Sequence, residues 1–128
     1  MADTTTDELL ALNLRLLNSI LQADWATYVE LCDESLTAFE PESRGQLVEG
    51  LPFHKFYFDL GPATGPRQAT MCSPHVRVLG DVAVVSYVRL TQKLDAGGVP
   101  TTLSVAETRV WQRQSGKWKH VHFHRSPT

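Results

Sequence analysis

The stretch VAVVSYVRLTQKLDAGGVPTTLSVAETRVWQRQSGKWKHVHFHR, residues 82–125, determines the fold class. Three long segments rich in β-branched residues are separated here by the turn-forming runs DAGG and SGK. Short breaks between long strands are typical of β-hairpins, so these segments are predicted to form an antiparallel meander. A fourth strand is expected ahead of them at residues 68–80, and Pro74 inside it predicts a bulge or a position at the sheet edge.

The first half of the chain has helical periodicity instead. A long helix is predicted after Thr5 or Thr6, either of which can cap it, with Asp7 and Glu8 in its first turn. Its leucines form two neighbouring stripes, so this helix is expected to pack on two partners. The other elements predicted in this half are a short helix from Trp25 to Cys32 capped by Asp24, a strand at LTAFEPE (36–42), a helix at LPFHKFYFDL (51–60) and a loop at GPATGPRQ (61–68).

Helices followed by a long antiparallel sheet predict one α+β domain over residues 1–128. A strongly twisted sheet of long strands curls, and helices can cover its concave side. That arrangement forms a cone with a cavity between sheet and helices, and such a cavity is a candidate ligand site.

Composition limits the classes of function. The chain is 42% hydrophobic and 20% charged with a net charge of −2, which gives no electrostatic basis for binding nucleic acid or an acidic membrane. The N-terminal run MADTTTDELLALNLRLL matches neither a signal peptide nor a transmembrane span, so the expected location is cytoplasmic. Cys32 and Cys72 lack a metal-type spacing and are expected to be free thiols.

Three arginines lie inside the predicted strands on faces that otherwise resemble core: Arg89, Arg109 and Arg125. An unpaired buried charge is costly, so each needs a counter-ion or a wet cavity. One interpretation places them at strand ends or pairs them with a carboxylate such as Glu107. The other aligns the three strands so that the arginines form one cationic pocket for a carboxylate or phosphate. Alternation leaves both interpretations open.

The run His120, His122, His124 is expected on one face of the last strand, with Phe123 and Arg125 on the other. Neighbouring histidines about 6.6 Å apart can share a metal, but three in a row span too far. No nearby cysteine or carboxylate motif completes such a site. A polar packing face is therefore the favoured interpretation, and we expect no metal and no cofactor.

Potential acids and bases are scattered along the chain without a motif that fixes a nucleophile–base pair. They are Asp24, Glu40, Glu42, Glu107, His54 and His75. His54 and Tyr57 lie three residues apart on a predicted helix and can meet on one face. A small proton-transfer enzyme of the isomerase or dehydratase type therefore stays an alternative. In the other interpretation Tyr57 belongs to the core, and His54 lines a cavity or accepts a backbone hydrogen bond.

The motifs LTAFEPE, LVEGLPFHKFYF, SPHVRVLG, YVRLTQKLDAGGVP and ETRVWQRQSGKWKHVHFHRS together resemble the association (hub) domain of calcium/calmodulin-dependent protein kinase II. The resemblance runs from about residue 7 to residue 126. It implies the cone-shaped nuclear transport factor 2-like fold, with N-terminal helices packed on a curved antiparallel sheet. It also implies an oligomerisation hub that assembles with itself from dimers into closed homo-oligomeric rings, with a kinase as a further partner.

The resemblance further implies a pocket that is lined by arginines and a histidine and accepts a small carboxylate. Matched motif by motif, these residues are Arg89, Arg109, Arg125 and His54, and Tyr57 joins them as a ligand-binding candidate.

The sequence departs from the pattern of the kinase hubs in a few places. It starts at Met1 with few residues ahead of the first helix, which suggests a stand-alone hub-like protein or a piece of a longer one. The segment 59–70 is shorter and lacks the family's aromatic residue. Ala106-Glu107 replaces a pair of acids, and Arg77 replaces a histidine.

Overall fold

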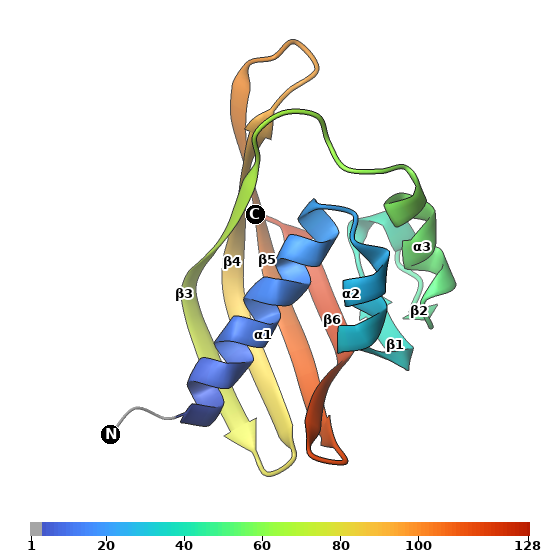
Figure 1. The fold of residues 1–128 in the computed structure, drawn as a ribbon, viewed down its shortest axis with the longest axis vertical. Coiled ribbons are helices and arrows are strands. Elements are labelled where there is room, and N and C mark those ends of the chain that lie inside the picture. Colours follow the sequence, from blue (N-terminus) through green and yellow to red (C-terminus); the bar gives the residue numbers. More distant parts are fainter. Residues whose placement is uncertain (1–3) are drawn as a thin grey trace.

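The computed structural model describes residues 4–128, so the first three residues of the N-terminal segment considered above lie outside it. Helices occupy one side of a six-stranded sheet (Figure 1). The elements are α1 (Thr4–Leu21), α2 (Trp25–Leu31), β1 (Cys32–Phe39), the 3-10 turn η1 (Pro41–Ser43), β2 (Val48–Glu49), α3 (Pro52–Asp59), β3 (Gln68–Leu79), β4 (Val82–Leu94), β5 (Pro100–Gln114) and β6 (Lys117–Pro127). Among the described residues, no helix is both long and apolar enough to cross a membrane.

The sheet has the strand order β2-β1-β6-β5-β4-β3. The predicted meander is confirmed, because β3 to β6 pair as sequential antiparallel neighbours. The sheet as a whole is mixed, since β1 pairs with β6 in parallel. Hairpin turns fix the direction only of strands that follow one another, and the whole meander separates β1 from β6 along the chain.

The edge strand β3 shows both consequences expected of Pro74. It lies at the end of the sheet, and its pairing with β4 shifts register between Cys72 and His75. Ser73 has a φ of 50° at this point, as expected where an extra residue bends an edge strand.

The expectation that His120, His122 and His124 share one face is wrong, because β6 contains a second bulge. Val110 pairs with His122 and Trp111 with His120, so Val121 is the extra residue. One extra residue reverses the two-residue period. His120 therefore lies on the concave face, fully buried and with its ring stacked on Phe123 at a centroid distance of 5.7 Å.

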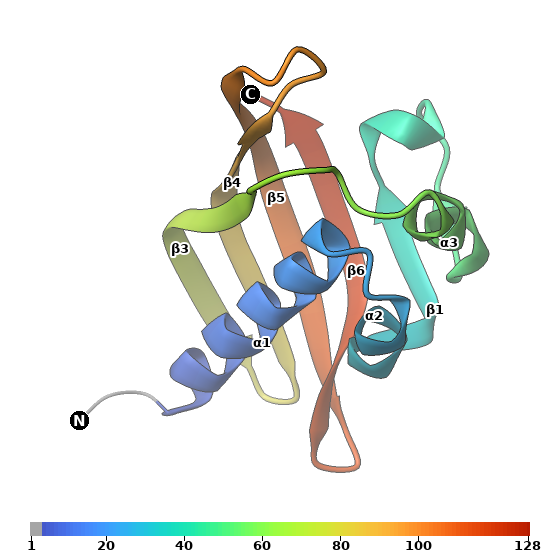
Figure 2. The same ribbon diagram turned by 45° about the horizontal axis from the view of Figure 1, so that its top comes forward.

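The helix α1 crosses the concave face of the sheet (Figure 2) and contacts both β3 and α2, as its two apolar stripes predict. It begins at Thr4, slightly before the expected caps, while Asp24 caps α2 as predicted, accepting a hydrogen bond from the Thr27 amide at 3.2 Å. Its buried side includes the polar residue Asn13, whose side-chain oxygen accepts a hydrogen bond from Trp111 Nε1 at 3.1 Å. After α3, the segment 61–67 runs back across the end of α1 to β3 (Figure 1).

Candidate functional site

A cavity of about 400 Å³ lies between the helices and the concave face of the sheet. Its walls come from all three helices, from strands β4 to β6 and from the segment after β1. They consist of Ile20, Tyr28, Glu40, Glu42, His54, Tyr57, Phe58, Arg89, Arg109, Phe123 and Arg125. All five residues proposed from the sequence (Arg89, Arg109, Arg125, His54 and Tyr57) border this one cavity.

Register brings the three arginines together. Val85 pairs with Arg109, Arg109 pairs with Phe123, and the inward-facing residues of neighbouring strands therefore share one surface. The arginines both line a cavity and pair with Glu107, so the two interpretations do not exclude each other. Arg89 Nη2 lies 3.1 Å and Arg109 Nη2 lies 3.2 Å from the Glu107 carboxylate.

Arg109 is the most deeply fixed of the three. Its side chain is 1% exposed, and its Nε donates to the Tyr87 hydroxyl at 2.9 Å. The Tyr87 hydroxyl in turn donates to Glu107 at 2.5 Å. The guanidinium lies over the Phe123 ring at 4.5 Å from its centroid. Burial lowers the pKa of Arg109, but Glu107, Tyr87 and Tyr28 together outweigh burial and raise the pKa, so the guanidinium stays charged.

Arg89 and Arg125 are less completely paired. Arg125 Nη1 donates to Glu42 at 3.0 Å, and its Nε lies 3.8 Å from Glu107 Oε2. The Nε atoms of Arg89 and Arg125 are both buried and have no hydrogen-bond acceptor among the described residues. A buried donor without an acceptor is unfavourable, so an anion in the cavity would satisfy groups that the chain leaves open.

His54 faces Glu40 rather than Tyr57. Its Nδ1 lies 3.8 Å from Glu40 Oε2, and both side chains are almost fully buried. Burial raises the pKa of Glu40 to about 7, while burial, reinforced by Arg109 and Arg125, lowers that of His54 to about 4. His54 is therefore neutral at physiological pH. Tyr57 stands at the rim with 41% of its surface exposed.

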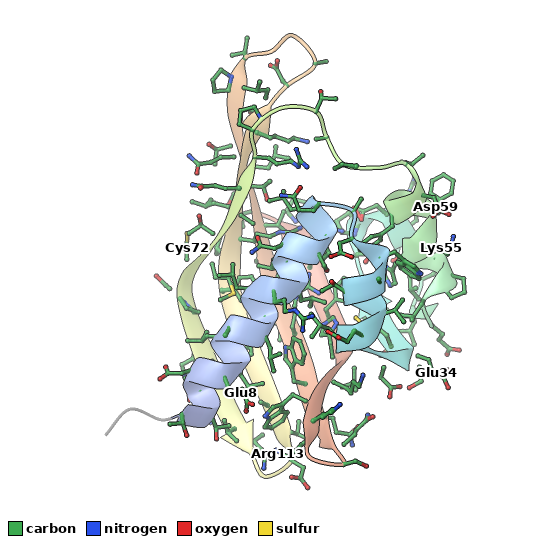
Figure 3. All side chains as sticks on the ribbon, viewed as in Figure 1. Glu8, Glu34, Lys55, Asp59, Cys72 and Arg113 are labelled. Carbon is green, nitrogen blue, oxygen red and sulfur yellow. The ribbon has the colours of Figure 1, made fainter. Side chains whose placement is uncertain are left out.

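His120 is a member of this group that the sequence did not indicate. Its Nε2 lies 3.4 Å from Arg109 Nη1, and its Nδ1 lies 3.4 Å from Cys32 Sγ. Only the bulge at Val121 turns this histidine inward, and alternation gives no sign of it. The predicted free thiols are confirmed: Cys32 is buried, which raises its pKa to about 12, and Cys72 lies on the edge strand β3 (Figure 3).

The charges around the cavity do not cancel. Three guanidinium groups face three carboxyl groups, and one of these, Glu40, retains much of its proton at neutral pH because burial raises its pKa to about 7. The arrangement can hold an anion with planar, paired donors.

The profile of the calcium/calmodulin dependent protein kinase II association domain matches residues 5–128 of the chain. The chain belongs to this family. The delta subunit of calcium/calmodulin-dependent protein kinase type II from Oryctolagus cuniculus is 46% identical over 122 residues, which cover 93% of this chain and 23% of that protein. The chain thus spans less than a quarter of that curated relative.

Solved structures agree with this membership. The association domain of C. elegans CaMKII superposes with a TM-score of 0.91 at 44% identity, covering 96% of this chain and 95% of the other. A nuclear transport factor 2-like superfamily protein from Salmonella enterica reaches a TM-score of 0.79 at 22% identity, covering 98% of this chain and 93% of the other, and shares the fold alone. The association domain therefore has the nuclear transport factor 2-like cone fold that the sequence predicts.

Proposed function

We propose that this association domain is an oligomerisation hub that assembles from dimers into closed rings, and that its arginine-lined cavity accepts a small carboxylate or another anion. Membership of the association-domain family over residues 5–128 carries the first part. Closed symmetry combines a self-complementary dimer contact with a repeating lateral one. By the same membership, we propose a cytoplasmic location and a kinase that carries the same domain as a further partner.

Native mass spectrometry of the full chain at micromolar concentration tests the assembly. We expect one dominant species with an even number of chains, larger than a dimer. A monodisperse monomer or an isolated dimer would contradict the hub.

The anion site rests on three guanidinium groups that meet at one cavity and on the buried Nε donors of Arg89 and Arg125. Charge-assisted hydrogen bonds contribute about 1.5–3 kcal/mol each, so losing one should weaken binding roughly tenfold or more. Calorimetric titration with short carboxylates should show this loss in Arg89→Gln and Arg125→Gln. Unchanged affinity in both variants would remove the arginines from the site.

Glu40 and His54 support proton transfer as a second candidate function. A carboxyl with a pKa of about 7 beside a neutral histidine is a plausible general base in a cavity. Deuterium incorporation into small ketones, followed by NMR in D2O, tests it. Exchange above background that disappears in Glu40→Gln would favour the enzyme, and background exchange with the wild-type protein would rule it out for these ketones.

A further inference from the structure

A second compartment of about 270 Å³ adjoins the cavity just described. The two share Ile20, Arg89 and Arg125 in their walls, so they meet at the arginines. The second compartment extends beneath the segment 61–63 toward Lys93 on β4. Its described walls hold four cationic side chains and no carboxylate, unlike those of the first.

Arg67 is one of these cations, and its charge is not neutralised. Its Nε donates to the Leu21 carbonyl at 3.1 Å, its Nη1 donates to the Gly65 carbonyl at 2.8 Å, and its Nη2 donates to Gln22. All three acceptors are neutral. They hold the guanidinium in place directly before the start of β3 and leave two of its five N–H groups for a ligand.

Lys93 is the other cation that lines the second compartment but not the first. It lies on the concave face of β4, four residues beyond Arg89 and therefore about 13 Å along the strand. Its side chain is half-buried, and its ammonium forms no hydrogen bond or ion pair within residues 4–128. Between Arg89 and Lys93 the wall consists of Thr91 on β4 and of the apolar side chains Leu17, Leu103 and Val105.

Resting on the anion site proposed above, we propose that the two compartments together bind a linear dicarboxylate. One carboxylate lies on Arg89 and Arg125, and the other on Arg67 and Lys93. The apolar wall between them contacts the methylene chain. Two groups of cations at the two ends of one compartment match a ligand with a charge at each end better than a monocarboxylate, which would leave Arg67 and Lys93 without a counter-ion.

Paired ligands of equal length test this inference by isothermal titration calorimetry on the assembled full chain. Adipate is compared with hexanoate, and suberate with octanoate, because each pair differs only in the second carboxylate. We expect the dicarboxylate of at least one pair to bind about tenfold more tightly, the value of one added charge-assisted contact. Lys93→Gln and Arg67→Gln should each bring that ratio of affinities toward one.

Lys117→Gln is the matched control, because Lys117 is exposed at the start of β6, at the opposite end of the sheet, and borders neither compartment. It should keep the wild-type ratio. Monocarboxylates that bind as tightly as their dicarboxylates at both lengths would overturn the second subsite while leaving the anion site intact. A ratio unchanged in Lys93→Gln and Arg67→Gln would do the same. Failure of all four acids to bind would overturn the dicarboxylate proposal, and the short-carboxylate titration described above decides the anion site separately.

Discussion

Glu107 is the counter-ion around which the concave face is arranged. Its side chain is 2% exposed, and its carboxylate lies within 4 Å of nitrogen atoms of three arginines. Burial raises the pKa of Glu107, but the three arginines and the hydrogen bond from Tyr87 together outweigh burial and lower the pKa below its ordinary value. The carboxylate therefore stays ionised at neutral pH.

Glu107→Gln should destabilise the fold by about 3–5 kcal/mol, because it leaves buried guanidinium groups without their shared partner. Urea unfolding at neutral pH measures the change. Glu34→Gln on β1 removes the same charge from an exposed side chain (Figure 3) and should alter stability by less than about 0.5 kcal/mol. Equal effects of the two substitutions would show that the arginines need no buried counter-ion.

The Glu40 carboxyl should make stability depend on pH. Its pKa in the folded protein is about 7, above the ordinary 4.5, so its contribution is complete below pH 4.5 and is lost as the pH rises through 7. His54 has the opposite effect on stability. Its pKa is lowered from 6.5 to about 4 in the folded protein, so its contribution to stability is lost as the pH falls from 6.5 to 4. The two effects nearly cancel in wild-type protein between pH 4.5 and 6.5.

Glu40→Gln removes only the first of these effects. The free energy of unfolding of the variant minus that of wild type should therefore rise by on the order of 3 kcal/mol as the pH increases from 5 to 8, since each pKa unit corresponds to about 1.4 kcal/mol. Urea midpoints at the two pH values measure the gain. A constant difference between variant and wild type would mean that Glu40 ionises normally.

Among the elements, α1 carries a buried asparagine within its apolar surface. Asn13 is fully buried, accepts from Trp111 Nε1 at 3.1 Å and donates to Met71 Sδ at 3.2 Å. The leucine pattern marked the helix and its two partners but gave no indication that an asparagine lies between them.

Asn13→Ala should cost about 1–3 kcal/mol, because the buried indole N–H of Trp111 loses its acceptor. Thermal and urea unfolding measure it. Asn18→Ala, on the exposed side of the same helix, is the control and should have little effect. A loss no larger than that of the control would indicate that Trp111 finds another acceptor.

The strands show which features can be predicted from sequence. The limits of β3 to β6 were predicted to within two residues, because runs such as DAGG and SGK end these strands through turn chemistry that acts locally. The strand predicted at 36–42 was placed wrongly, since β1 runs from Cys32 to Phe39, and β2 was not predicted. The bulge at Val121 was not predicted, since it appears only in the pairing of β6 with β5 and not in the neighbouring residues of the sequence. The arginines were found because a charge on an apolar face is anomalous, whereas the facing of Glu40 and His54 depends on how α3 packs and leaves no mark in the sequence.

At the scale of the whole molecule, the sheet is covered on one face only. All three helices lie on its concave side (Figures 1 and 2), and the convex face carries a row of paired residues across three strands, Val84, Val110 and His122. Val84 and Val110 form an apolar pair in the middle of an open sheet face, between Arg77 on β3 and His122 on β6, and such a pair can pack against another surface. In the assembly proposed above, a second copy of the chain is the partner expected for this face.

Val84→Lys should therefore reduce the mass of the assembled particle, because it places a charge in the centre of the proposed contact. Native mass spectrometry measures the mass, and circular dichroism shows whether the subunit keeps its fold. Val99→Lys makes the same change in the β4–β5 turn, where the side chain is 58% exposed, and should leave the particle intact. If Val84→Lys keeps the full mass, the convex face is not the contact between copies. If both variants lose mass, the loss reflects added charge rather than the position of Val84. A reduction confined to Val84→Lys would assign the contact to the convex face and leave the arginine cavity, on the opposite side of the sheet, open to ligands in the assembly.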